Sequence, residues 1–228
     1  AVKAAAAVKA AAAVKASPLL AAAEAKVQWV AIRGGSFQMG AADGDSDEKP
    51  VRTVKIKTFE LGKTEVTVAQ YGVCVRAGQC KAPDTGRYCN WEKSDRAEHP
   101  VNCVSWDDAT KFAKFAGGRL PSEAEWEFAA RSGGKAQSYP WGNAKPSCDV
   151  AVMDDGGFGC GQNSTGPVCS KPRGNTGAGL CDMSGNVREW VADWYGPYGE
   201  APTDGSARTS AAQYRVFRGG GWNDKAPY

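Results

Sequence analysis

The sequence predicts an α+β domain that is rich in loops, with small antiparallel sheets and a few helices, preceded by a helical segment of alanine and lysine. Three observations lead to this fold class. Short runs of alternating apolar residues lie near both ends of the region 27–228, two segments begin with helix-capping signals, and residues 133–180 contain no periodic pattern. Loops should therefore make up much of the domain.

Residues 1–26 differ in composition from the rest of the chain. Residues 1–18 hold three copies of a six-residue unit, and the third residue of each copy is a lysine. Because alanine is the strongest helix former, we expect a helix. Six residues advance a helix by about 600°, so the lysines point in different directions and no amphipathic face forms. This argues against a membrane-surface helix and leaves a solvated spacer, a contact with a partner in a larger assembly, or a disordered segment.

The domain that begins at residue 27 opens with strand signals. Residues 27–32 and 52–61 are predicted strands, and the second alternates apolar with charged side chains. A turn-bearing stretch rich in Gly and Asp lies between them. Two further short strands are expected at residues 187–193 and 214–218.

Helices are predicted where capping residues precede apolar residues at helical spacing. Ser105 can cap a helix that carries two aspartates in its first turn and ends at Gly117. Ser122 and Glu125 form a capping box for the next helix. A shorter helix is expected earlier in the chain, at residues 68–76.

Charge and hydropathy exclude two classes of partner. The formal net charge is +3 at pH 7, and the three lysines of residues 1–18 account for this excess. The predicted domain is therefore close to neutral, whereas a nucleic-acid-binding face needs clustered basic residues, so we expect no nucleic-acid partner. No apolar run is long enough to cross a bilayer, so we expect no membrane span.

The cysteine content predicts disulfides. Eight cysteines lie in or beside stretches rich in Gly, Pro and Asn, which favours bridges that hold loops. Zinc is an alternative, but there is no Cys-x-x-Cys pair and the single histidine, His99, precedes Pro100; buried free thiols are a third. Because disulfides persist in oxidising compartments, we expect an extracytoplasmic location, in the periplasm, at the cell surface or secreted. The candidates are Cys74, Cys80, Cys89, Cys103, Cys148, Cys160, Cys169 and Cys181.

Residues 179–190 carry acidic side chains around a glycine turn. Calcium takes about six to eight oxygen ligands, which an irregular loop supplies as carboxylates and inward-turned carbonyl groups. Asp182 and Glu189 are the candidate carboxylate ligands. The alternative is that both acids only form surface ion pairs with Arg188 or Arg173.

Several motifs along the chain belong together. They are Gly35-Ser36-Phe37-Gln38-Met39-Gly40, Lys63-Thr64-Glu65-Val66-Thr67, His99-Pro100-Val101, Arg119-Leu120-Pro121-Ser122-Glu123-Ala124-Glu125-Trp126-Glu127, Tyr139-Pro140-Trp141-Gly142, Gly185-Asn186-Val187-Arg188-Glu189-Trp190 and Arg218-Gly219-Gly220-Gly221-Trp222. Together they resemble the formylglycine-generating enzyme family, whose sulfatase-modifying factor domain would span residues 27–228. The resemblance implies a C-type-lectin-like fold and a bound calcium ion. Its matched ligands are Asp182 and Glu189, with Gly185 and Val187 through their carbonyl groups.

The resemblance breaks down at the catalytic positions. The family's oxidase holds copper through two cysteines, since Cu(I) prefers soft thiolates. Asp224 stands at the position of the first cysteine, and the sequence ends at Tyr228, one residue before the second. Gly221 replaces the serine of the motif, and Arg188 stands where the family often has a tryptophan. These departures argue against copper and lean against an enzyme.

Three functions stay open at this point. The first is an extracytoplasmic, non-catalytic binding or scaffold module, stabilised by calcium and disulfides, for a protein or carbohydrate ligand. The others are a copper-dependent oxidase that converts a sulfatase cysteine to formylglycine, and a structural subunit of a surface assembly that docks through residues 1–18. The alternative role for the aromatic side chains is core packing. The candidate ligand-binding residues are Arg188, Trp194, Tyr195, Tyr198, Trp222, Asn223 and Asp224.

Overall fold

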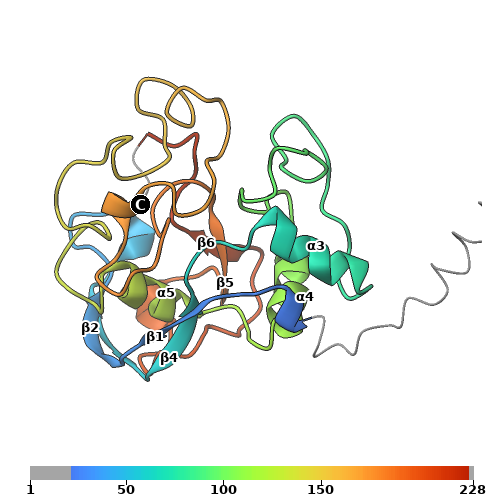
Figure 1. The fold of residues 1–228 in the computed structure, drawn as a ribbon. Helices are drawn as coiled ribbons and strands as arrows, with labels where there is room; N and C mark the ends of the chain where they lie inside the picture. Colours follow the sequence, from blue (N-terminus) through green and yellow to red (C-terminus); the bar gives the residue numbers. More distant parts are fainter. Residues whose placement is uncertain (1–21, 226–228) are drawn as a thin grey trace, which may run out of the picture.

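Small antiparallel sheets, a few helices and long loops make up the protein, as the sequence predicts. A computed structural model describes residues 22–225 (Figure 1). The predicted helix and assembly contact of residues 1–18 lie outside the described residues and stay predictions. Each sheet has two strands, and the helices are short.

The N-terminal half of the fold is built on a long hairpin. Strand β1 (Trp29–Ile32) pairs with β4 (Phe59–Gly62), and β2 (Gly35–Met39) pairs with β3 (Arg52–Ile56). The prediction of one strand over residues 52–61 was therefore wrong in part, because these residues form two strands in two sheets. The expected turn-bearing stretch also contains a strand, β2.

The two sheets are halves of one bent hairpin. Ile32 lies opposite Phe59 and Gly35 lies opposite Ile56, so the register continues through the break. The bend falls at Gly34, whose backbone N–H donates to Thr58 Oγ1 at 3.1 Å. A Cβ at Gly34 would collide with the Ile56 carbonyl group, so the close approach of the two chains requires glycine. Alternation alone does not reveal such a bend, since the pattern on either side is unchanged.

The three predicted helices are confirmed. Helix α3 is Val68–Arg76, α4 is Trp106–Phe115 and α5 is Glu123–Ala130. Each begins with a capping box in which the capping side chain accepts from the third helical N–H. The two later strands are β5 (Glu189–Trp194) and β6 (Arg215–Arg218), each starting one or two residues later than expected.

Two apolar clusters form the core. The larger surrounds α5, which is buried along most of its length and packs against β2, β3, β5 and β6. The smaller lies between α3 and α4, which stand together beside the sheets (Figure 1). Its centre is the stacked pair of Tyr71 and Phe112, with ring centroids 5.4 Å apart. The loops that fill the rest of the fold have little core of their own.

Disulfides hold these loops. All eight cysteines are paired, as the sequence predicts, and each pair joins cysteines that are neighbours along the chain. The bridges are Cys74–Cys80, Cys89–Cys103, Cys148–Cys160 and Cys169–Cys181. Two of them lie in or at the end of residues 133–180, where the regular structure is one 3-10 turn, Pro172–Gly174. Covalent constraint thus adds to the limited burial of this region, where Ala151, Val152 and Met153 are among the few buried apolar residues.

The two serine caps differ in burial and allow a matched test. Ser122 is 2% exposed, accepts from Glu125 N at 3.0 Å and donates to the Gly205 carbonyl at 2.7 Å. Ser105 lies at the surface, and within residues 22–225 its hydroxyl bonds only Asp108. We expect Ser122→Ala to lower the free energy of unfolding by about 2 to 3 kcal/mol, because it loses the cap and leaves a buried carbonyl unpaired. Ser105→Ala should cost about 0.5 to 1 kcal/mol. Urea titrations followed by tryptophan fluorescence measure both, and equal losses would contradict this account.

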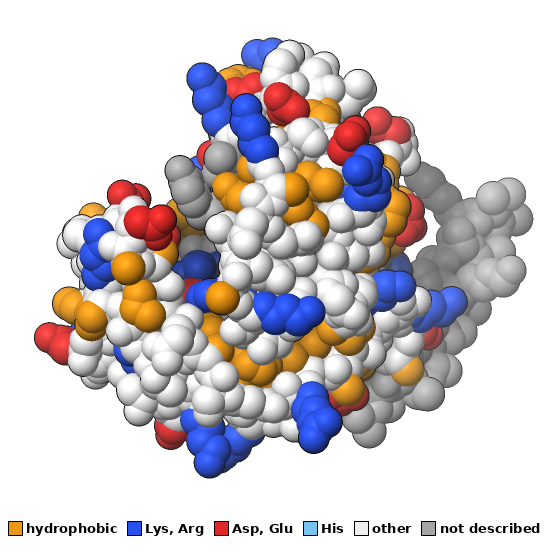
Figure 2. Space-filling model, turned by 90° about the vertical axis from the view of Figure 1, so that its left-hand side faces the viewer, with side chains coloured by type: hydrophobic (Ala, Val, Ile, Leu, Met, Phe, Trp, Pro, Cys, Tyr) orange, Lys and Arg blue, Asp and Glu red, His pale blue; other side chains and the backbone are white. Residues whose placement is uncertain are grey.

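The surface mixes both charges. Lys and Arg side chains and Asp and Glu side chains are both scattered over the face in Figure 2, between separate hydrophobic patches. This agrees with the near-neutral composition of the domain. Among the described residues, none of the helices combines the length and apolar character that a bilayer span requires.

Candidate functional site

The acidic segment predicted to bind calcium is a tightly held, irregular loop. Asp182, Gly185 and Asn186 have positive φ angles of 55°, 89° and 62°. Gly185 N donates to the Gly219 carbonyl at 2.7 Å, and Asn186 N donates to the Val152 carbonyl at 2.8 Å. A Cβ at Gly185 would lie 2.7 Å from the Val152 oxygen, so this turn needs glycine. The loop is thereby fixed between two other segments of the chain.

Both predicted carboxylate ligands are turned inward. Asp182 is buried and its Oδ2 accepts from Cys169 N, while Glu189 Oε2 accepts from Trp126 Nε1 at 2.9 Å. Burial raises the pKa of Asp182 and raises that of Glu189 to about 7. The alternative interpretation, in which these acids only pair with surface arginines, is wrong. Arg188 pairs with Asp224 and Arg173 with Asp149.

A third buried carboxylate, Glu65, joins this cluster. Its Oε2 accepts from Asn186 Nδ2 at 2.7 Å and its Oε1 accepts from Val187 N at 2.9 Å. Burial raises its pKa well above the ordinary value, and the charges of Asp182 and Glu189 raise it further. We did not predict this role, because Glu65 lies more than a hundred residues from the loop it supports. The one sequence signal for Glu65 was its place in the motif at residues 63–67.

The chemistry of these residues fits a hard cation. The charges of Asp182 and Glu189 raise the pKa of Glu65, and the charge of Asp182 raises that of Glu189. No arginine or lysine of residues 22–225 forms an ion pair with any of the three. Buried negative charge without a basic partner is costly, and oxygen-binding cations offset it. Within the same residues, no three acidic, histidine or cysteine side chains converge on one point. A cation here would therefore need carbonyl ligands as well as carboxylates.

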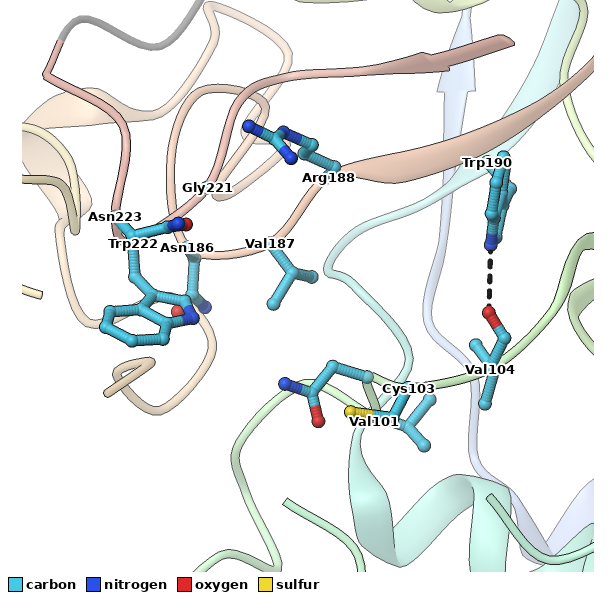
Figure 3. A pocket seen from close by; sticks show the side chains of 11 residues that line it. Val101, Cys103, Val104, Asn186, Val187, Arg188, Trp190, Gly221, Trp222 and Asn223 are labelled. Atoms are coloured by element: carbon cyan, nitrogen blue, oxygen red, sulfur yellow. Dashed lines mark hydrogen bonds between the residues drawn. The ribbon is translucent and has the colours of Figure 1, made fainter. Parts of the chain in front are cut away.

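Next to this loop lies a small pocket of about 200 Å³ (Figure 3). Residues 101–104 face residues 186–190 across it, and Trp222 and Trp190 lie at opposite ends. Trp190 Nε1 donates to the Val104 carbonyl at 3.1 Å and closes one end. The backbone N–H of Trp222 donates to the Asn186 carbonyl at 2.8 Å, so the carboxylate loop and the pocket share a wall.

Asp224 sits beside this pocket in a fixed position. Its carboxylate accepts from Arg188 Nη2 at 2.7 Å, from Arg188 Nε at 3.2 Å and from Gly221 N at 2.8 Å. Arg188 also lies over the Phe217 ring, with Cζ 5.2 Å from its centroid. Arg188 and Asp224, the two positions at which we expect a departure from the family motif, therefore form an ion pair with each other.

The predicted ligand-binding residues fall into three groups. Arg188, Trp222 and Asn223 line the small pocket. Arg188, Asn223, Asp224, Tyr195 and Tyr198 line a neighbouring groove of about 1190 Å³, which the acidic loop from Asp43 to Glu48 also lines. Trp194 lines neither; its ring packs 3.6 Å from Arg215 Cζ, in the structural role that was the alternative for the aromatic residues.

Tyr198 is part of the core rather than a free side chain. It is 4% exposed, and its hydroxyl donates to Glu123 Oε1 at 3.0 Å and accepts from Arg218 Nη1 at 2.9 Å. His99 also has a structural place, with Nδ1 2.8 Å from Thr165 Oγ1, and lines neither cavity. Burial and the charge of Arg96 lower its pKa.

Sequence comparison decides the family. Residues 16–227 match the sulfatase-modifying factor enzyme 1-like domain. The chain belongs to this family. It is 33% identical over 252 residues to the formylglycine-generating enzyme of Streptomyces coelicolor, covering 85% of this chain and 78% of that protein. It is 32% identical over 248 residues to the inactive Cα-formylglycine-generating enzyme 2 of Bos taurus, covering 88% and 78%.

A solved structure shares the fold. PvdO from Pseudomonas aeruginosa superposes with a TM-score of 0.72 at 30% identity, over 86% of this chain and 82% of that one. The fold class and the family resemblance drawn from the motifs are thus confirmed. Relatives of this chain include proteins named as enzymes and proteins named as inactive. The activity therefore depends on the site residues of each chain.

Proposed function

We propose that this protein is an extracytoplasmic, non-catalytic binding module built on the formylglycine-generating enzyme fold. The observation that carries the proposal is the position of Asp224. A hard carboxylate that already accepts three hydrogen bonds, two of them from Arg188, is a poor ligand for Cu(I). All eight cysteines of the sequence are consumed in disulfides, which leaves no thiolate of this sequence to take its place.

Calcium and disulfides stabilise the module in this proposal. Asp182 and Glu189 would bind the ion through carboxylates, and Gly185 and Val187 through carbonyl groups, while Glu65 holds the loop by its bonds to Asn186 and Val187. The ion would supply positive charge to a buried acidic cluster and has no role in a reaction. The four disulfides support an oxidising compartment outside the cytoplasm.

The proposal is tested by copper binding and turnover. Purified protein is incubated with Cu(I) and a cysteine-containing sulfatase peptide, beside the Streptomyces coelicolor enzyme, and aldehyde formation is measured by mass spectrometry. We expect no aldehyde and no stoichiometric copper. The variant Asp224→Cys restores one thiolate and should retain more copper than the natural protein, which shows that the assay detects binding at this position. Turnover by the natural protein would establish the oxidase instead.

A further inference from the structure

Three aromatic rings form a continuous cluster at the open end of the small pocket. Trp222 contacts Tyr88 with ring centroids 5.6 Å apart and Phe158 with centroids 6.0 Å apart. Tyr88 is 54% exposed and Phe158 is 48% exposed. Of the three residues only Trp222 is a predicted ligand contact, because the other two rings come from loops far away in the chain. We call these three residues the aromatic platform.

The backbone that carries the platform is held in place although the rings lie at the surface. The carbonyl group of each of its residues accepts a hydrogen bond: Tyr88 from Asn102 Nδ2, Phe158 from Asn163 N and Trp222 from Gly159 N. A disulfide-bonded cysteine lies directly after Tyr88, and another lies two residues after Phe158. Exposed rings that are ordered before any ligand arrives lose little conformational freedom on binding, which is a property of binding surfaces.

The arrangement of the rings limits what can bind. Ammonium groups and proline-rich peptides use gaps or grooves between aromatic rings. Trp222 contacts Tyr88 at an interplanar angle of 44° and Phe158 at 85°, so no gap is left between Trp222 and either neighbour. Stacking of nucleic-acid bases needs a positively charged channel, and the domain is close to neutral. An uncharged ligand that packs an apolar face against an exposed ring fits both observations.

The polar groups beside the platform suit hydroxyl groups. Asp224 neutralises Arg188, and the pair offers acceptor oxygens and, at Arg188 Nη1, a donor without a partner among residues 22–225. The exposed Asn223 lines the same pocket, and its side-chain amide offers a further donor and acceptor. A sugar ring presents C–H groups on its face, which the negative faces of aromatic rings attract, and hydroxyl groups at its edge.

We propose that Tyr88, Trp222 and Phe158 form a stacking surface for a neutral saccharide, whose hydroxyl groups bond Asn223 and the Arg188–Asp224 pair. The pocket volume of about 200 Å³ is below the ~300 Å³ of common small-molecule sites, so it accommodates a small part of the ligand while the rest lies on the rings. This inference rests on the proposed binding function and names its ligand class.

The test uses the full chain on an array of defined neutral oligosaccharides, with affinities of the hits measured by titration calorimetry. We expect binding, and a loss of at least tenfold in affinity in both Tyr88→Ala and Phe158→Ala. The matched control is Tyr214→Ala, which removes a 61% exposed aromatic side chain outside the platform and should bind like the natural protein. Circular dichroism and thermal melts check that each variant is folded.

Two results would overturn the saccharide proposal. The first is an array without any bound oligosaccharide; the second is saccharide binding that both platform variants retain in full. A peptide-display selection on the same protein distinguishes failure of the saccharide proposal from failure of the proposed binding function. Peptides that bind through Tyr88 and Phe158 would refute the saccharide and leave the binding module standing, whereas turnover in the copper assay would refute the module itself.

Discussion

Reduction of the four disulfides is expected to unfold the domain at neutral pH. The bridges close loops with sequence separations of 6, 14, 12 and 12 residues. On the chain-entropy account each contributes about 2 to 3 kcal/mol and the four together about 10 kcal/mol, which equals the whole stability of a typical domain. Tryptophan fluorescence and circular dichroism during titration with a reductant measure the transition. A fully reduced chain that keeps its native spectrum would contradict this expectation.

Removing single bridges separates their roles. We expect the double variant Cys169→Ala, Cys181→Ala to lose about 3 kcal/mol and also calcium affinity, because Cys169 N donates to Asp182 and Cys181 directly precedes it. The matched control is Cys74→Ala, Cys80→Ala, which opens a shorter loop at the end of α3, about a hundred residues before Asp182 in sequence. It should lose about 2 kcal/mol with unchanged calcium affinity. Equal effects of the two double variants on calcium would argue against a link between the bridge and the loop.

Calcium-free protein is expected to become less stable as the pH rises from 4.5 to about 7. The pKa of Glu189 rises from its ordinary value of 4.5 to about 7, chiefly through burial, and those of Glu65 and Asp182 shift in the same direction. The folded state then holds protons that the unfolded state has lost, so the stabilisation is present at low pH and disappears as the pH passes the folded pKa. For Glu189 alone the loss is about 3 kcal/mol.

Calcium should reverse this loss above pH 7, since it binds the deprotonated carboxylates. At about one hundred times its Kd, a bound ion adds about 2.7 kcal/mol. Thermal melts at pH 5 and pH 8, in chelator and in calcium, measure both effects, and magnesium is the control because it demands a tighter octahedral site. Glu189→Gln should remove most of the calcium gain. A melting temperature at pH 8 that is the same in chelator and in calcium would refute the calcium proposal.

The first residues of the helices and the oxidation of the cysteines could be predicted from the sequence, because both depend on local signals. The capping boxes at Ser105 and Ser122 each join residues three positions apart, and the structure contains both. An even set of cysteines in loop-rich segments predicted disulfides, and all eight are bonded. The bend at Gly34 was missed, since it depends on how closely Ile56 approaches from the opposite strand.

The candidate site could be predicted only in part, because it also depends on contacts between distant segments. The sequence proposed Asp182 and Glu189 as a pair, but their third acidic neighbour, Glu65, and the supports around them come from distant segments. The sequence suggested Asp182 or Glu189 as ion-pair partners of Arg188. In the fold Arg188 pairs with Asp224, 36 residues away.

By itself the sequence determined the fold class, the family, the helices and the oxidation of the cysteines, because motifs and capping signals act within a few residues. The tertiary structure alone decided which cysteines pair, that Glu65 lies near the loop of Asp182 and Glu189, and that Tyr88 and Phe158 contact Trp222 at the surface. Such contacts depend on the path of loops between distant residues, and that path follows from packing and covalent bridges rather than from any local pattern.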